Sequence, residues 1–308
     1  MGSGKETVVS GFENIAFERE APIESTLKKA QNQGLTNVIQ TVDFIEQYKD
    51  MVTYEDAEKE FNELKTSFRA ENASAAQMAE NRGKNRYMNV VPNDLTRVKL
   101  LNGQDNDYIN ANFVNLKADH EYIATQGPLP GTKEDFWTMV WQENVRTVVM
   151  LTQLVENGKI KCDQYWPFDE SKEAAAKGLE IEKIEEHVNP LWTERTFYLL
   201  NENESRKIKQ FQLTSWVNSD VPASMLDFVT FIRHVRSEGA NVGGSPVEGA
   251  PLVVHCSDGG LKTGLFIAID KVLGDLKNES FVDILGMVYK MKQARQVLVS
   301  SEVGRKAK

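Results

Sequence analysis

The chain has 308 residues, 41% of them hydrophobic, which is enough to bury a large core within a single domain. Its 45 acidic and 36 basic residues give a formal net charge of -9, which argues against a nucleic-acid partner held by electrostatic attraction. The two cysteines, Cys162 and Cys256, stand far apart in the sequence, so we expect free thiols and a reducing, cytoplasmic compartment.

The hydropathy of the chain bears on its relation to membranes. No apolar run approaches the roughly 20 residues of a membrane span. The first residues contain neither a secretory apolar region nor a myristoylation signal. We therefore expect no direct membrane insertion by this chain, and it remains open that the chain is the intracellular part of a larger or membrane-associated protein.

The N-terminal part of the chain is polar and has short apolar stripes at helical spacing. One such stripe consists of Ile45, Tyr48 and Val52. From Lys84 onward, short β-like segments take over. We interpret residues 1–55 as a helical N-terminal lead-in and residues 56–308 as the main domain.

Three apolar segments of the main domain predict strands of a central sheet. Residues 108–114 alternate apolar and polar side chains, whereas residues 147–151 and 252–254 are continuous apolar runs, as in buried strands. Residues 169–178 and 237–249 are charged or glycine-rich without periodicity, so we predict surface loops there.

Three potential capping boxes stand before apolar stripes and predict helices. In each, a serine or threonine is followed three residues later by an aspartate, which satisfies N–H groups of the first helical turn. The pairs are Thr132 with Asp135, Ser224 with Asp227, and Ser280 with Asp283.

The most informative stretch is residues 253–264, in which a strand-like run leads into a glycine-rich loop and then into a helical pattern at residues 265–276. Such a turn directs successive backbone N–H groups and the positive end of the helix dipole at one spot, which favours an anion. Cys256 stands where a thiolate would be stabilised and nucleophilic. From the pattern alone, a buried structural cysteine is the alternative.

Residues 255–264, His-Cys-Ser-Asp-Gly-Gly-Leu-Lys-Thr-Gly, resemble the signature His-Cys-Ser-x-Gly-x-Gly-Arg-Ser/Thr-Gly of the classical protein tyrosine phosphatases. Further segments match the family in the expected order, namely residues 84–90 with Arg97 and Val98, then 107–114, 122–128 and 161–167. The resemblance covers residues 56–302. It implies an α/β fold with a central mixed sheet flanked by helices, and no cofactor.

The resemblance also implies roles for single residues, and several of them are changed. Cys256 keeps the position of the nucleophile, as a vestige of that role, and His255 orders the loop through hydrogen bonds. Lys262 replaces an arginine that grips two phosphate oxygens, and an ammonium lacks that planar fork. Asn218 replaces the aspartate that acts as general acid. Ser300 replaces a glutamine that positions water.

Two further changes affect the loop itself. Asp258 replaces an alanine; a carboxylate about 6 Å from the sulfur, at an effective dielectric of about 20, would raise the thiol pKa by about two units. Leu261 replaces a glycine, and a positive φ at this position would strain the loop.

Asn89 replaces an acidic residue that holds the substrate backbone, while Tyr87, which packs on the phosphotyrosine ring, is kept. The implied ligand-binding set is Tyr87, Asn89, Ser257, Asp258, Gly259, Gly260, Leu261, Lys262 and Thr263.

These changes predict a degenerate family member, similar to the inactive second domains of receptor-type tyrosine phosphatases. It would be a pseudophosphatase, not an enzyme, that binds and regulates a protein partner such as a tyrosine-phosphorylated kinase segment. Two alternatives stay open: a slow tyrosine phosphatase that uses Cys256, with Asp220 as acid, or a scaffold that binds through a surface away from the cleft. The acidic residues 180–186 suit either a partner surface or a solvated face. No metal site is expected, because the cysteines and histidines do not fall at ligand spacing.

Overall fold

The computed structural model describes residues 38–41, 43, 72–101, 106–117, 121–217, 221–239, 249–279 and 281–299. Most of the predicted lead-in, residues 1–55, lies outside the described residues, and so do Asn218, Asp220 and Ser300. Within the lead-in, β1 (Val38–Gln40) is a strand and not a helix. It pairs antiparallel with β13 (Phe281–Asp283), and Ile39 is buried there, so a tertiary contact determines its conformation.

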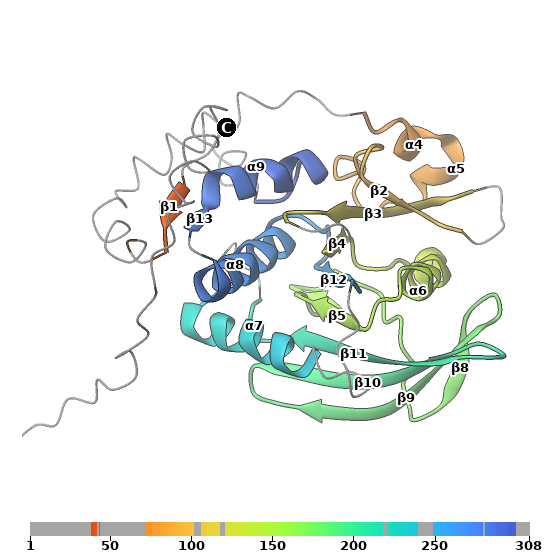
Figure 1. The fold of residues 1–308 in the computed structure, drawn as a ribbon. Coiled ribbons are helices and arrows are strands. Elements are labelled where there is room, and N and C mark those ends of the chain that lie inside the picture. Colours follow the sequence, from red (N-terminus) through yellow and green to blue (C-terminus); the bar gives the residue numbers. More distant parts are fainter. Residues whose placement is uncertain are drawn as a thin grey trace, which may run out of the picture.

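A nine-stranded mixed sheet forms the centre of the molecule, as predicted (Figure 1). Its four middle strands, β4, β12, β5 and β11, run parallel to one another, and the outer pairs are antiparallel. In spatial order the strands are β2 (Arg97–Lys99), β3 (Tyr108–Val114), β4 (Tyr122–Thr125), β12 (Leu252–His255), β5 (Thr147–Met150), β11 (Ser205–Leu213), β10 (Trp192–Leu200), β9 (Leu179–Val188) and β8 (Lys172–Ala176).

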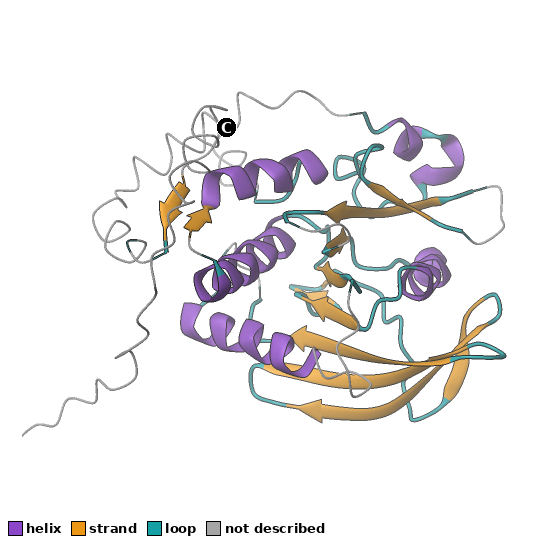
Figure 2. Ribbon diagram, in the orientation of Figure 1, coloured by secondary structure: helices purple, strands orange, loops and turns teal. Residues whose placement is uncertain are grey.

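Helices cover both faces of this sheet (Figure 2). On one face lies α6 (Lys133–Gln142), and on the other lie α7 (Met225–Gly239), α8 (Leu261–Asn278) and α9 (Ile284–Ala294). Each face has its own hydrophobic core, with Trp137 in the first and Phe266 in the second. All residues of β4, β5 and β12 are buried, as expected for strands covered on both sides. Short elements complete the fold: α4 (Ser74–Gln77), α5 (Ala79–Arg82), η1 (Pro130–Thr132), β6 (Val155–Glu156) and β7 (Lys159–Ile160).

The predicted helices are present, but the starts of α6 and α9 differ from the capping-box pattern. The Ser224 hydroxyl accepts a hydrogen bond from Asp227 N at 3.2 Å, as predicted. Thr132 instead accepts from Leu129 N and makes no side-chain cap to α6. Before α9 the cap is Asp283, which accepts from Gly286 N at 2.8 Å, because the residues preceding it pair as β13.

One predicted loop is a strand. Residues 172–176 form β8 at the edge of the sheet and pair with β9, because Ala175 packs into the core beneath them. The prediction of a loop at residues 169–178 was therefore wrong in its middle part. In the second predicted loop, α7 continues to Gly239 and residues 240–248 lie outside the described part of the chain.

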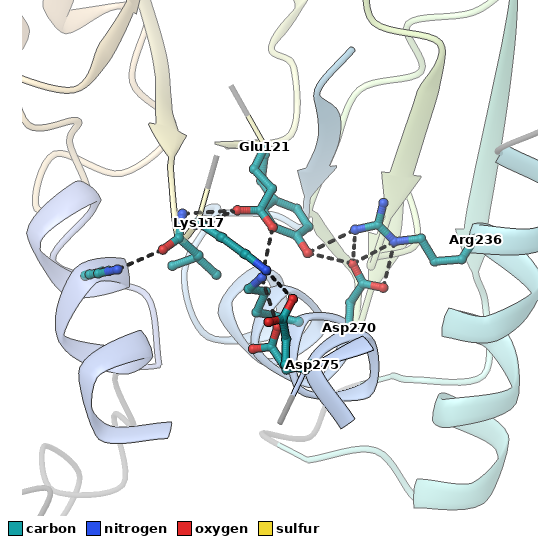
Figure 3. A network of polar contacts seen from close by, with 10 residues as sticks. Lys117, Glu121, Arg236, Asp270 and Asp275 are labelled. Carbon is teal, nitrogen blue, oxygen red and sulfur yellow. Dashed lines mark hydrogen bonds and ion pairs between the residues drawn. The ribbon is translucent and has the colours of Figure 1, made fainter. Parts of the chain in front are cut away.

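A buried polar network joins α7, α8 and β4 (Figure 3). Asp270 on α8 is only 5% exposed. It accepts hydrogen bonds from Arg236 Nε on α7 at 2.8 Å and from the Tyr122 hydroxyl on β4 at 2.8 Å. Because the carboxylate has a cationic partner and further donors, its burial is compensated.

Asp270→Asn is expected to lower the free energy of unfolding by about 2 kcal/mol, because it replaces the charge-assisted hydrogen bonds between Asp270 and Arg236 by weaker ones. Urea unfolding followed by circular dichroism measures the change. Glu180→Gln is the control, since Glu180 forms an ion pair with Lys172 in which both side chains are exposed. That variant should lose at most about 1 kcal/mol. Equal losses in the two variants would contradict the special role of Asp270.

The structure also bears on the relation to membranes. Among the described residues, no helix combines the length and the apolar character that crossing a bilayer requires.

Candidate functional site

The Cys256 loop, residues 256–260, connects the end of β12 to the start of α8. Gly259 has φ +68°, and a Cβ atom there would lie 2.5 Å from the Thr125 carbonyl oxygen, so only glycine fits. The loop is also connected to the segment that follows β4, because Gly127 N donates to Ser257 O at 3.1 Å. The predicted order of strand, glycine-rich loop and helix is confirmed.

The positive φ that would strain the loop at Leu261 is not present. Leu261 is the first residue of α8 and does not have a positive φ. Gly259 takes the left-handed conformation instead, and Gly260 precedes the helix at φ -107° and ψ -113°. The condition for strain at Leu261, a positive φ, is therefore not met in this turn.

Cys256 is almost completely buried at the base of the loop. Its Sγ donates to Asp258 Oδ1 at 3.1 Å and accepts from Thr263 Oγ1 at 3.3 Å. Burial of the thiol, and then the charge of Asp258, raise the Cys256 pKa to about 11. At neutral pH this group is therefore mostly a thiol. Asp258 acts in the expected direction, but burial is the larger cause.

The Asp258 carboxylate also occupies part of the place where the loop amides would bind an anion. The same Oδ1 atom accepts a hydrogen bond from Gly260 N at 2.9 Å. This amide belongs to the turn that the sequence predicts to hold phosphate. A phosphoryl oxygen would have to compete with the Asp258 carboxylate for this donor.

Lys262 directs its ammonium to residues outside the Cys256 loop. Nζ donates to the carbonyl oxygen of Trp216 at 2.9 Å and lies 3.6 Å from Glu156 Oε1. It also lies 5.2 Å from the centre of the Trp216 ring, within cation–π range. Burial lowers the Lys262 pKa below the usual value for lysine.

Arg295 is a site residue that the sequence did not reveal. Its fully buried guanidinium donates to the carbonyl oxygens of Gly259 and Asp258, both at 2.9 Å, and to Asn112 Oδ1 at 3.0 Å. Burial lowers its pKa to about 10. By binding these two carbonyl groups, Arg295 fixes the orientation of the peptide units in the loop. The only signal in the sequence is its place in the segment that resembles the family near Ser300.

His255 has the supporting role that the resemblance implied. Its Nε2 lies 2.8 Å from the Tyr165 hydroxyl and its Nδ1 lies 3.1 Å from the carbonyl oxygen of Cys256. Because the carbonyl can only accept, Nδ1 carries the proton and Nε2 accepts from Tyr165. Burial lowers the His255 pKa to about 4, so the ring is neutral at pH 7.

One predicted ligand residue from outside the loop, Tyr87, contacts it. The hydroxyl oxygens of Tyr87 and Ser257 are 2.9 Å apart, so the segment expected to recognise phosphotyrosine reaches the Cys256 loop. Asn89 is exposed two residues further along. Asn218 and Ser300 lie outside the described residues. In the part of the chain that the structure describes, no three His, Cys, Asp or Glu side chains are grouped so that they could hold a metal ion.

Comparison with known proteins gives consistent matches. The family model for protein-tyrosine phosphatase matches residues 81–303. The receptor-type tyrosine-protein phosphatase eta of Gallus gallus is 41% identical over 249 residues, which are 79% of this chain and 17% of that protein. Its counterpart in Homo sapiens is 42% identical over 253 residues, covering 79% and 18%. The human phosphatidylinositol phosphatase PTPRQ is 34% identical over 277 residues, covering 88% and 12%. The chain spans less than a fifth of these relatives.

These matches overturn one interpretation of the sequence, namely that the chain is not an enzyme. Proteins 41% and 42% identical to it over most of its length are named as tyrosine-protein phosphatases. Asp258 and Lys262 differ from the family's residues, but the site keeps its cysteine, its glycine turn and its helix. These two differences alone do not show that the chain is inactive.

Proposed function

The chain belongs to the protein-tyrosine phosphatase family. From this membership we propose that it binds tyrosine-phosphorylated protein segments at the Cys256 loop. We also propose that it hydrolyses phosphotyrosine, with Cys256 as the nucleophile. One observation carries the proposal. The buried Sγ of Cys256 lies at the start of a glycine turn that ends in the N-terminus of α8, where backbone N–H groups and the helix dipole favour a phosphate.

In the proposed reaction the Cys256 thiolate attacks phosphorus, and the bond from phosphorus to the tyrosine oxygen breaks. The leaving oxygen takes a proton from water, since Asn218 is an amide and cannot supply one. Water then hydrolyses the cysteinyl phosphate, which yields inorganic phosphate and returns the thiolate. The loop amides bind the phosphoryl oxygens throughout, and Tyr87 lies beside the aromatic ring of the substrate.

A protein substrate fits the charge of the chain better than an anionic lipid surface does. The formal net charge is -9, which disfavours approach to acidic membranes. We propose that the partner is a phosphotyrosine-containing protein, such as a kinase segment, and that the domain regulates it. The receptor-type relatives and the two free cysteines support a position on the cytoplasmic side, within a longer protein.

The pH dependence of phosphate release tests this proposal. Because the Cys256 pKa is about 11, the thiolate fraction is small at pH 7 and rises with pH. Release from a phosphotyrosine peptide should therefore increase by about tenfold per pH unit between about pH 7 and 10. The peptide without protein gives the blank, and a phosphatidylinositol phosphate is the comparison substrate. No release above the blank at any pH would contradict the proposal, and faster release from the lipid would reassign the substrate.

A further inference from the structure

A chain of hydrogen-bonded side chains crosses the sheet from β9 to the residue before Cys256. Four of its members are buried and are each 8% exposed or less, namely Arg195, Gln210, Tyr165 and His255. The fifth member, Glu186 on β9, is exposed. The chain therefore connects a charged group at the surface with the start of the Cys256 loop.

Arg195 determines how the amide of Gln210 is oriented. The two residues lie directly opposite each other on β10 and β11. Arg195 Nη1 donates to Gln210 Oε1 at 2.9 Å, and Arg195 Nε donates to Glu186 Oε2 at 2.6 Å. The guanidinium carbon also lies 4.4 Å from the centre of the Trp166 ring. Because a guanidinium has only donors, the amide oxygen of Gln210 must face it, and the amide nitrogen points away.

The amide nitrogen of Gln210 then sets the direction of the next two hydrogen bonds. It donates to the Tyr165 hydroxyl oxygen at 2.7 Å. The single proton of that hydroxyl is therefore directed at His255 Nε2, 2.8 Å away. The other nearby acceptor, Met150 Sδ at 4.0 Å, is a weak one. His255 Nε2 accepts, so the ring carries its proton on Nδ1.

Both ends of the chain require the same direction. At one end the guanidinium of Arg195 can only donate, and at the other end the carbonyl oxygen of Cys256, 3.1 Å from His255 Nδ1, can only accept. Reversing any bond between them would leave a buried donor or acceptor without a partner, which is unfavourable. The side chains of four different segments thus agree on one protonation state.

We infer that Gln210, oriented by Arg195, is a positioning residue for the nucleophile of the proposed reaction. By making Tyr165 donate to His255, it keeps the ring proton on Nδ1 and the Cys256 carbonyl bound to the ring. The carbonyl and the following N–H of a trans peptide point in opposite directions, so the Ser257 N–H points away from the ring. The inference rests on the proposed function, because it concerns the loop that would hold the phosphoryl group.

Gln210→Glu tests the inference. A carboxylate beside Arg195 stays ionised and accepts from the guanidinium, but it cannot donate to Tyr165. The Tyr165 hydroxyl should then donate to this carboxylate, and its oxygen should accept from His255 Nε2. Since burial holds the His255 pKa at about 4, the ring stays neutral and its proton moves from Nδ1 to Nε2. Nitrogen-15 NMR of the ring at pH 7 should show at least about tenfold more rings with a proton on Nε2 than in the unchanged chain.

Gln212→Glu is the matched control. Gln212 lies on the same strand, and its Oε1 accepts from the same Arg195 Nη1 at 2.8 Å. Its amide nitrogen, however, donates to the carbonyl oxygen of Thr152 at 3.1 Å and not to Tyr165. This variant introduces the same buried charge beside Arg195, yet the His255 proton should remain on Nδ1.

Arg195→Met gives a second measurement that does not depend on whether Gln210→Glu folds. Without the guanidinium, the amide of Gln210 can turn its oxygen to the Tyr165 hydroxyl. A fraction of the His255 rings should then carry the proton on Nε2. Circular dichroism establishes which variants are folded.

Release of phosphate from a phosphotyrosine peptide is followed in the same samples. Gln210→Glu should lower kcat by about tenfold, the value of one hydrogen bond lost at the Cys256 carbonyl, and Gln212→Glu should stay within about twofold of the unchanged chain. If His255 Nε2 carries no proton in either Gln210→Glu or Arg195→Met, or if the proton moves and kcat does not fall, the inference is overturned and the proposed function stands. If no sample releases phosphate, the proposed function is overturned, and the NMR comparison still decides whether Gln210 sets the state of His255.

Discussion

Replacing Asp258 by alanine is expected to lower the Cys256 pKa by about one unit and to raise its alkylation rate at pH 7 by about threefold. The carboxylate accepts from the thiol at 3.1 Å and is, after burial, the main cause of a Cys256 pKa of about 11. Its removal leaves about tenfold more thiolate at pH 7, because this pH lies below both pKa values. A less basic thiolate is also a weaker nucleophile. The alkylation rate therefore rises by only about half as much as the thiolate fraction on a logarithmic scale.

Alkylation by iodoacetamide between about pH 6 and 10, read by mass spectrometry at Cys256, measures the effect directly. Asp258→Asn is the matched control: it keeps an oxygen that accepts from Gly260 N but carries no charge. If charge is the cause, both variants should show a downward shift of the alkylation profile. If only the alanine variant shifts the alkylation profile, the hydrogen bond from Gly260 N matters more than the charge. If neither variant shifts the profile, Asp258 does not raise the Cys256 pKa. Phosphate release should increase with the alkylation rate.

Local patterns predicted the core of this fold because each rests on neighbouring residues. The continuous apolar runs at 147–151 and 252–254 became buried parallel strands, and the glycine-rich stretch after Cys256 became a turn into a helix. The edge of the sheet was harder to predict. Residues 172–176 are mostly polar or small, and they form β8 because β9 offers pairing partners and Ala175 has a core to enter.

The residues that control the site chemistry were only partly predictable. The chemistry of Asp258 followed from its place two residues after Cys256. The partners of Lys262 did not, because Trp216 and Glu156 belong to distant segments that only the folded chain brings together. Arg295 was missed for the same reason, since its role depends on complete burial against carbonyl groups 36 and 37 residues earlier in the chain. A changed residue can be recognised by resemblance, whereas its new partners have to be seen in three dimensions.

Cys256→Ser is expected to reduce phosphate release from a phosphotyrosine peptide by about a thousandfold, or to the level of the blank. A serine hydroxyl ionises far less readily than a thiol, so the nucleophile is lost, while the similar size of the side chain preserves the buried site. Peptide binding should persist, because the loop amides, Lys262 and Tyr87 are unchanged. Calorimetric titration of the variant measures this binding, and the release assay measures turnover in the same samples.

Cys162→Ala provides the matched control for this prediction. Cys162 is the other buried cysteine, and burial raises its pKa far above the usual value, so it is inert as a nucleophile. Its Sγ lies near Gly127 and not in the Cys256 loop. This variant should release phosphate at a rate close to that of the unchanged chain. Equal release by the Cys256→Ser variant and the unchanged chain would mean that the phosphate comes from another site, and Cys256 would then be a structural cysteine of the second hydrophobic core.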